Sequence, residues 1–181
     1  MKDWRYTPTA VVLHNLIAGL IVATFPLGLY MSDMALSPRK LQLYSYHKWT
    51  GIVILLLAIL RLLWRAAHRP PALPADMPHL QVSGAHATHF ALYGLMLAVP
   101  LSGWLMSSAL GFQVVLFGVL PLPDLIAANK ATGHSLRSLH EWLNYSLLVL
   151  VMLHVGAALY HQFILRDGIL RRMALGWGER K

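Results

Sequence analysis

The fold follows from residues 139–161, which have the sequence LHEWLNYSLLVLVMLHVGAALYH. This stretch is long enough to cross a bilayer as a helix, because about 20 apolar residues span a hydrocarbon core of roughly 30 Å. Two histidines, His140 and His154, lie fourteen residues apart within it. At about 100° and 1.5 Å per residue, this spacing returns to nearly the same helix face and separates the rings by roughly 21 Å. One face of one helix therefore carries an imidazole near each edge of the membrane.

The composition of the whole chain agrees with a membrane protein. Of its 181 residues 57% are hydrophobic and only 12% are charged, which is atypical of a soluble domain. Cysteine is absent, so disulfides, iron–sulfur clusters on thiolates and cysteine-based zinc sites are excluded. The formal net charge of +8 could indicate nucleic acid or anionic lipid as a partner. Its distribution favours membrane lipid, and we expect no nucleic acid.

Four segments are apolar and long enough to span, and we predict an all-α integral membrane four-helix bundle. The predicted helices cover approximately residues 10–31, 44–64, 86–109 and 139–165 of a single transmembrane domain, residues 1–181. Pro26 and Pro100 fall inside two of them, which membrane helices tolerate with a kink.

Two connections interrupt this pattern. The proline-rich stretch 68–84, HRPPALPADMPHLQVSG, is predicted to be a loop, because proline does not fit a helix interior. Residues 110–138 contain the apolar piece FQVVLFGVLPLP, which is too short and too broken to span. We predict an interfacial or re-entrant segment there.

The orientation follows from the distribution of lysine and arginine. One side of the membrane, with both termini and the loop between the second and third helices, holds ten of them, and the other side holds five. The positive-inside rule therefore predicts that both termini are cytoplasmic. The first side holds Lys2, Arg5, Arg61, Arg65, Arg69, Arg166, Arg171, Arg172, Arg180 and Lys181; the other holds Arg39, Lys40, Lys48, Lys130 and Arg137.

Two further histidines match the pair on the last helix in depth. On this topology His47 lies at the outer depth, with His140, and His14 lies at the inner depth, with His154. Two imidazoles occupying both axial positions suit a haem b that carries electrons, since oxygen binding is then disfavoured. A single membrane histidine can equally form a core hydrogen bond or part of a proton or zinc pathway. Spacing alone leaves those alternatives open, and it also allows His89 to replace His14 at the inner depth.

Four stretches resemble the bacterial cytochrome b-561 family, within the superfamily that includes the cytochrome b subunits of nickel–iron hydrogenases. They are RYTPTAVVLH (5–14), HKWTGIVILLLAILRLLWR (47–65), HFALYGLMLAVPLSGWLMSSALG (89–111) and LHEWLNYSLLVLVMLHVGAALYHQFILRDGILRRM (139–173). The resemblance implies four helices in the bacterial inner membrane and two b haems. Their axial ligands would be an outer pair, His47 and His140, and an inner pair, His14 and His154.

Other residues are candidates for supporting roles. His161 and His89 could bind a quinone or relay its proton, since quinone reduction consumes protons; the alternative is a hydrogen bond to a haem propionate or a place at the headgroup level. Arg61 and Arg65 could pair with propionates or extend to lipid phosphates. Gly103 could let a macrocycle or a helix approach closely, as could Gly51 and Gly94.

We therefore expect a quinone-linked oxidoreductase that moves electrons between a periplasmic donor and ubiquinone or another membrane quinone. Superoxide oxidation coupled to ubiquinone reduction is an activity that the resemblance implies for the bacterial branch. A second interpretation is a cytochrome b anchor subunit that relays electrons between quinone and a periplasmic redox partner. A third is a histidine-lined proton or metal transporter, which the absence of an evident inverted repeat disfavours.

Overall fold

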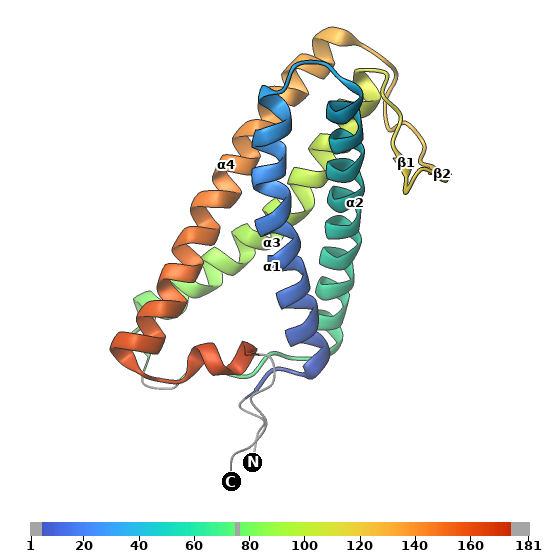
Figure 1. The fold of residues 1–181 in the computed structure, drawn as a ribbon. Coiled ribbons are helices and arrows are strands. Elements are labelled where there is room, and N and C mark those ends of the chain that lie inside the picture. Colours follow the sequence, from blue (N-terminus) through green and yellow to red (C-terminus); the bar gives the residue numbers. More distant parts are fainter. Residues whose placement is uncertain (1–4, 75–76, 175–181) are drawn as a thin grey trace.

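The computed structural model describes residues 5–74 and 77–174, and four long helices dominate it. They are α1 (Pro8–Asp33), α2 (Pro38–Ala67), α3 (His79–Ala109) and α4 (Lys130–Tyr160). The helices run alternately up and down, so α1 begins and α4 ends at the same end of the bundle (Figure 1). We call this the inner end and the opposite one the outer end. All four helices are long and apolar enough to cross a membrane, which confirms the predicted all-α class.

Local capping chemistry defines where the helices start. Thr7 and Ser37 each precede a proline at the first helical position, and their hydroxyls accept hydrogen bonds from Ala10 N–H and Lys40 N–H. The side chain of Asn129 caps α4 by accepting from Thr132 N–H at 3.0 Å. These side chains satisfy backbone donors that a helix start leaves without a partner.

All four helices begin earlier than predicted. The difference is small for α1, which starts at Pro8, and larger for α2, which starts at Pro38 because Ser37 caps it. α3 starts at His79, so the last residues of the predicted loop 68–84 are helical. Pro78 occupies the N-cap position, where its missing N–H costs no helical hydrogen bond. α4 starts at Lys130 because Asn129 caps it, although its first turns, KATGHSLR, are too polar to show an apolar helical period. Hydropathy locates the part of a helix that lies in lipid, and here the helices extend beyond that part.

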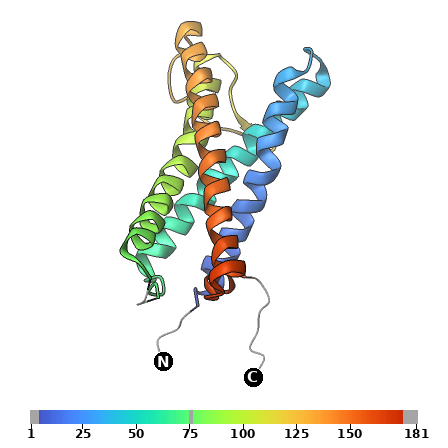
Figure 2. The ribbon, with the colours of Figure 1, turned by 90° about the vertical axis from the view of Figure 1, so that its left-hand side faces the viewer.

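The closest helix packing is between α3 and α4 and between α1 and α2, and α2 also packs against α3. The buried core cluster consists of Ile17, Ala58 and Met96, one residue from each of the first three helices. In Figure 2 the connection between α1 and α2 lies well apart from the start of α4 at the outer end. α4 therefore packs against α3 and stands apart from the α1–α2 hairpin.

Large apolar side chains also cover the outside of the bundle. Each helix contributes some that are more than 60% exposed, and they include Val22, Leu63, Phe90, Trp142 and Met152. A soluble monomer rarely exposes such an extended apolar surface, whereas lipid chains solvate it. The exposed surface thus agrees with the apolar composition.

The segment between α3 and α4 forms a small hairpin at the outer end. Strands β1 (Val115–Leu116) and β2 (Leu120–Pro121) pair antiparallel around Phe117 and Gly118, which both have positive φ angles of 52° and 76°. The indole of Trp49 in α2 donates to the Val115 carbonyl at 2.6 Å, and the indole of Trp104 in α3 donates to the Pro123 carbonyl at 3.2 Å. The segment predicted to be interfacial or re-entrant therefore contains a short hairpin attached to two helices by tryptophan side chains.

At the inner end, α4 continues as a π-helix, η1 (His161–Leu165), and a 3₁₀-helix, η2 (Ile169–Met173), which passes beneath the bundle (Figure 1). The carbonyl of Met173 accepts from Asn15 Nδ2 at 3.2 Å, and Arg172 donates to the Ala72 carbonyl at 2.7 Å. Three of the charges used to predict the orientation, Lys2, Arg180 and Lys181, lie outside the described residues.

Candidate haem sites

The structure brings the four candidate ligands together as two pairs. The ring centroids of His47 and His140 are 6.2 Å apart at the outer end, with an interplanar angle of 84°. The rings of His14 and His154 are also 6.2 Å apart, with an angle of 81°. In each pair one imidazole comes from α4 and the other from the α1–α2 hairpin. Each pair therefore spans the separation between α4 and that hairpin.

The separation fits a metal placed between the two rings. Since a metal–imidazole nitrogen bond is about 2.0–2.1 Å and that nitrogen lies about 1.1 Å from the ring centre, two rings on opposite sides of one iron have centroids roughly 6.3 Å apart. If the two rings of each pair only packed against each other, nothing would require the same centroid separation in both pairs. Both pairs thus have the spacing that a bis-histidine haem demands.

A cavity surrounds the outer pair. It has a volume of about 470 Å³, and both His47 and His140 line it. A second space of about 230 Å³ continues from the same two histidines toward Met96 and Leu147. Most of the lining residues are uncharged, and three cationic side chains, Lys40, Lys48 and Arg137, are among them, which suits a porphyrin with two propionates.

Two glycines bring the outer imidazoles close to neighbouring helices. A Cβ atom added at Gly28 would lie 3.1 Å from Cε1 of His47, and one at Gly103 would lie 3.0 Å from Cε1 of His140. Both distances are shorter than an ordinary van der Waals contact, so any larger side chain would displace the ring. Gly103 was among the glycines expected to permit close approach, whereas a Cβ at Gly51 or Gly94 would meet no atom within 4 Å.

The His140 ring is further oriented by hydrogen bonds. Its Nδ1 lies 3.0 Å from the Val99 carbonyl and 3.1 Å from the Ser102 hydroxyl. The carbonyl can only accept, so Nδ1 carries the proton and donates it. Nε2 is then the nitrogen with a free lone pair, which is the arrangement that a metal-ligating histidine normally shows.

The inner pair has a third histidine beside it. The rings of His89 and His154 are 5.4 Å apart, closer than those of His14 and His154. The Nδ1 atom of His14 is buried and has no hydrogen-bond partner among the described residues. Buried polar nitrogens normally have a hydrogen-bond partner, so the His14 imidazole fits a residue that binds a cofactor through its ring. His89 packs next to the inner pair on α3, in a place where it could contact a cofactor edge.

Cationic side chains lie near both pairs. Arg61 and Arg65 lie over the ring of Tyr93, with guanidinium carbons 5.3 and 5.7 Å from its centroid. At the outer end Lys40, Lys48 and Arg137 line the cavity. Each end of the bundle therefore offers positive charge to a carboxylate or another anion.

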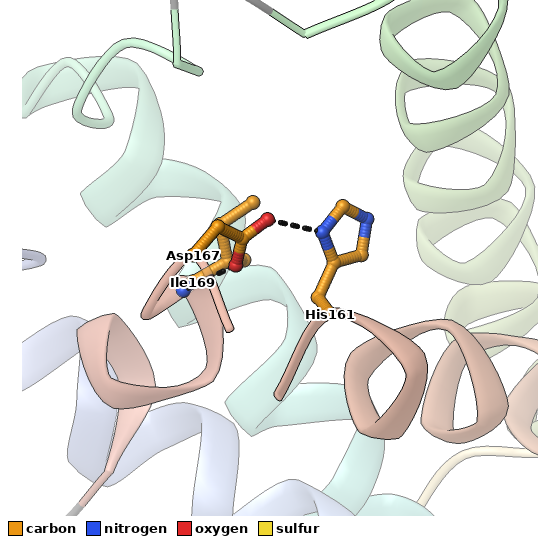
Figure 3. Close-up of polar contacts among 3 residues, drawn as sticks. All are labelled: His161, Asp167 and Ile169. Carbon is orange, nitrogen blue, oxygen red and sulfur yellow. Dashed lines mark hydrogen bonds and ion pairs between the residues drawn. The ribbon is translucent and has the colours of Figure 1, made fainter. Parts of the chain in front are cut away.

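His161 lies away from both pairs, in η1. Its Nδ1 is 2.5 Å from Oδ2 of Asp167, a partner that the sequence analysis did not identify (Figure 3). The sequence signal was the Asp167-Gly168 dipeptide, which is typical of a turn. Gly28 and Ser102 were also missed, because nothing in the local sequence distinguishes them from other small helix residues.

Comparison with known proteins identifies the family of this chain. The family model described as prokaryotic cytochrome b561 matches residues 5–176. The chain is 34% identical over 171 residues to cytochrome b561 homolog 2 of Escherichia coli (strain K12), covering 93% of this chain and 90% of that protein. It is 28% identical to a probable superoxide oxidase, CybB, of Yersinia pestis, covering 93% of this chain and 95% of that one. Cytochrome b561 homolog 1 of Escherichia coli (strain K12) is 27% identical, with 93% and 96% covered.

Members of this family are haem-containing electron-transport proteins of the inner membrane, which agrees with the four membrane-spanning helices. The match extends over nearly the whole chain and includes all four paired histidines. The chain therefore belongs to the prokaryotic cytochrome b561 family.

Proposed function

We propose that this cytochrome holds two b haems and transfers electrons between a one-electron donor at its outer end and the membrane quinone pool. The observation that carries the proposal is the repeated 6.2 Å separation within two histidine pairs, each of which has one member on α4. Two pairs at different depths supply ligands for two cofactors. A single pair would supply only one.

The protein residues have distinct tasks in this proposal. His47 and His140 hold the outer haem, and His14 and His154 hold the inner one. A bound haem supplies one-electron redox chemistry, and two imidazoles leave the iron no open position for oxygen. The Val99 carbonyl accepts the proton of His140 Nδ1, which would leave Nε2 as the nitrogen available to hold the haem.

Superoxide is the donor that the outer cavity suits best. Lys40, Lys48 and Arg137 line it, and only one carboxylate, Glu141, is among its lining residues. A positive potential raises the local concentration of a small anion. The probable superoxide oxidase among the relatives supports the same donor. The balanced reaction takes two superoxide ions, one quinone and two protons, and it yields two oxygen molecules and one quinol.

The inner end suits the quinone. His161 and His89 are the candidates that would bind its head group or pass it a proton, and Arg61 and Arg65 are the candidates for the inner haem propionates. Arg61 and Arg65 are half-buried and lie over the Tyr93 ring, which supports a role inside the protein for these two guanidinium groups.

The experiment that tests the two-haem proposal is a reduced-minus-oxidised spectrum with pyridine-haem stoichiometry on the purified protein. We expect two b haems in the wild type and one each in His140→Ala and His154→Ala. His134→Ala is the matched control, because His134 is exposed on the same helix, and it should retain both. Loss of both haems in each ligand variant, or full retention, would contradict the assignment of one α4 histidine to each haem.

A further inference from the structure

The chain reverses direction directly after η1, and this reversal determines where Asp167 lies. Arg166 and Gly168 on either side of it both have left-handed backbone angles, with φ of 53° and 76°. Two left-handed residues in three turn the chain back, so Asp167 returns to His161, six residues before it. Such a conformation is unfavourable for arginine, and the surrounding contacts must maintain it.

Both oxygens of the Asp167 carboxylate are engaged. Oδ2 contacts Nδ1 of His161 at 2.5 Å, and Oδ1 accepts from the backbone N–H of Ile169 at 3.0 Å (Figure 3). The second bond runs from the backbone N–H two residues further on, so it forms an Asx turn directly before η2. The carboxylate is thus held by the backbone of the following helix and does not depend on His161 for its position.

η2 is itself attached to other parts of the bundle. Asn15 of α1 donates to the Met173 carbonyl, and Arg172 reaches the Ala72 carbonyl between α2 and α3. Arg5 also donates to the Arg171 carbonyl at 3.3 Å. These contacts fix the carboxylate relative to the whole inner end, where a flexible tail would leave it free to rotate.

The consequence for His161 is a defined ring orientation. A carboxylate accepts the proton of Nδ1 whether the imidazole is neutral or charged, so only Nε2 can exchange a proton with another group. Figure 3 shows Nε2 pointing away from Asp167. The side chains of His161 and Asp167 are 15% and 24% exposed, so water can reach the pair. His161 lies near the end of the last candidate membrane span, Lys130–Leu165, and the charged residues Arg166 and Asp167 follow it directly, so we expect the pair to lie where lipid meets water.

We propose that Asp167 is a positioning residue that holds His161 so that Nε2 delivers a proton to a quinone at the inner end of the bundle. This inference rests on the proposed quinone-linked function. The proton donor is the imidazolium form of His161, in which both Nδ1 and Nε2 carry a proton. In the proton step the Nε2–H bond breaks, an O–H bond forms on the reduced quinone, and His161 becomes neutral with its proton on Nδ1. A proton from the solvent then restores the imidazolium. The one-electron donor of the proposed function supplies two electrons in succession, and two such proton deliveries complete one quinol.

The decisive variants are Asp167→Asn and His161→Gln in the full-length, haem-loaded protein. The matched control is Asp33→Asn, which neutralises an exposed carboxylate at the other end of α1. The protein is first reduced with dithionite, and its reoxidation by a short-chain ubiquinone is followed by the haem absorbance. We expect Asp167→Asn to lower the rate at saturating quinone by about 10- to 100-fold, as removal of a carboxylate that orients an imidazole typically does. The quinone concentration at half saturation should stay within about twofold, because Nε2 itself remains.

A second readout does not depend on activity. In ¹⁵N-histidine-labelled protein, solid-state NMR distinguishes the two tautomers, and the His161 signals are those that His161→Gln removes. We expect the wild type and Asp33→Asn to show a protonated Nδ1 and Asp167→Asn to lose that preference. Asp167→Glu keeps the negative charge and should recover part of the rate. If Asp167→Asn does not bind haem, Asp167→Glu serves as the test variant instead.

Each remaining outcome overturns the inference in a recognisable way. If Asp167→Asn reoxidises at the wild-type rate while His161→Gln is slow, Asp167 does not position the histidine. If both variants react at the wild-type rate, His161 is not the proton donor, although the quinone-linked function stands. If the wild-type protein binds two haems but no quinone reoxidises it, the proposed function fails and this inference fails with it.

Discussion

At the residue scale, small side chains decide how the outer imidazoles are placed. Gly28 of α1 lies against the His47 ring of α2, and Gly103 of α3 lies against the His140 ring of α4. The hydrogen bond to the Val99 carbonyl then fixes the rotation of the His140 ring about its Cβ–Cγ bond. Ligand identity alone would leave each ring free to adopt several rotamers, so these contacts preorganise the pair.

We expect Gly103→Val to remove the outer haem. A Cβ at this position already lies 3.0 Å from the His140 ring, so a β-branched side chain forces the ring away from Val99 and from the metal. Pyridine-haem analysis should fall from about two haems per chain toward one. Gly84→Val, on the same helix, is the control, because a Cβ at Gly84 would meet no atom within 4 Å. An unchanged haem content in Gly103→Val would show that the close contact does not restrict the ring.

At the element scale, the outer hairpin depends on the helices beside it, because it belongs to no larger sheet. Two residue pairs form its strands, and a two-stranded hairpin alone is at best marginally stable. The indoles of Trp49 and Trp104 therefore hold it against α2 and α3. Val114, next to β1, is buried and also lines the outer cavity, so the hairpin connects the surface to the candidate haem site.

Trp49→Phe should loosen this hairpin without unfolding the bundle. Phenylalanine keeps the aromatic contacts with Tyr46 and Phe117 but loses the hydrogen bond to the Val115 carbonyl. One such bond contributes about 1 kcal/mol, which corresponds to roughly fivefold more frequent opening. Limited proteolysis within residues 111–125 of the detergent-solubilised protein should accelerate by that factor. Trp142→Phe, at a 73% exposed site, should cleave at the wild-type rate, and equal rates for the two variants would exclude the hydrogen bond as the cause.

At the scale of the whole molecule, four helices place the start of α1 and the end of α4 together. The segment after α4 crosses beneath the bundle and bonds to α1 and to the loop between α2 and α3 (Figure 1). The two ends of the molecule consequently differ. The inner end is crossed by basic helix η2, and the outer end opens into a cationic cavity.

The absolute orientation is a prediction that cysteine labelling can test. The chain has no cysteine, so single substitutions carry no background. Ala127→Cys lies in the exposed outer segment and should react with a membrane-impermeant maleimide in intact spheroplasts. Ala72→Cys, in the loop at the inner end, should react only after permeabilisation. The reverse pattern would contradict cytoplasmic termini and would place the cationic cavity on the cytoplasmic side.

The sequence by itself determined the number of membrane helices and the common face of His140 and His154, because these depend on length, hydropathy and helical period alone. The sorting of the four candidate histidines into an outer and an inner pair also followed from their positions along the predicted helices. Helix starts were less predictable, since caps such as Asn129 extend helices past their apolar parts.

Only the tertiary structure decided which atoms meet. Val99 and His140 lie 41 positions apart in the chain, and Gly28 of α1 contacts His47 of α2. Asp167 reaches His161 because two left-handed residues turn the chain, and no periodicity encodes that turn. Such contacts arise from how whole helices pack and how the chain reverses. A sequence pattern, which records only neighbours along one element, does not contain them.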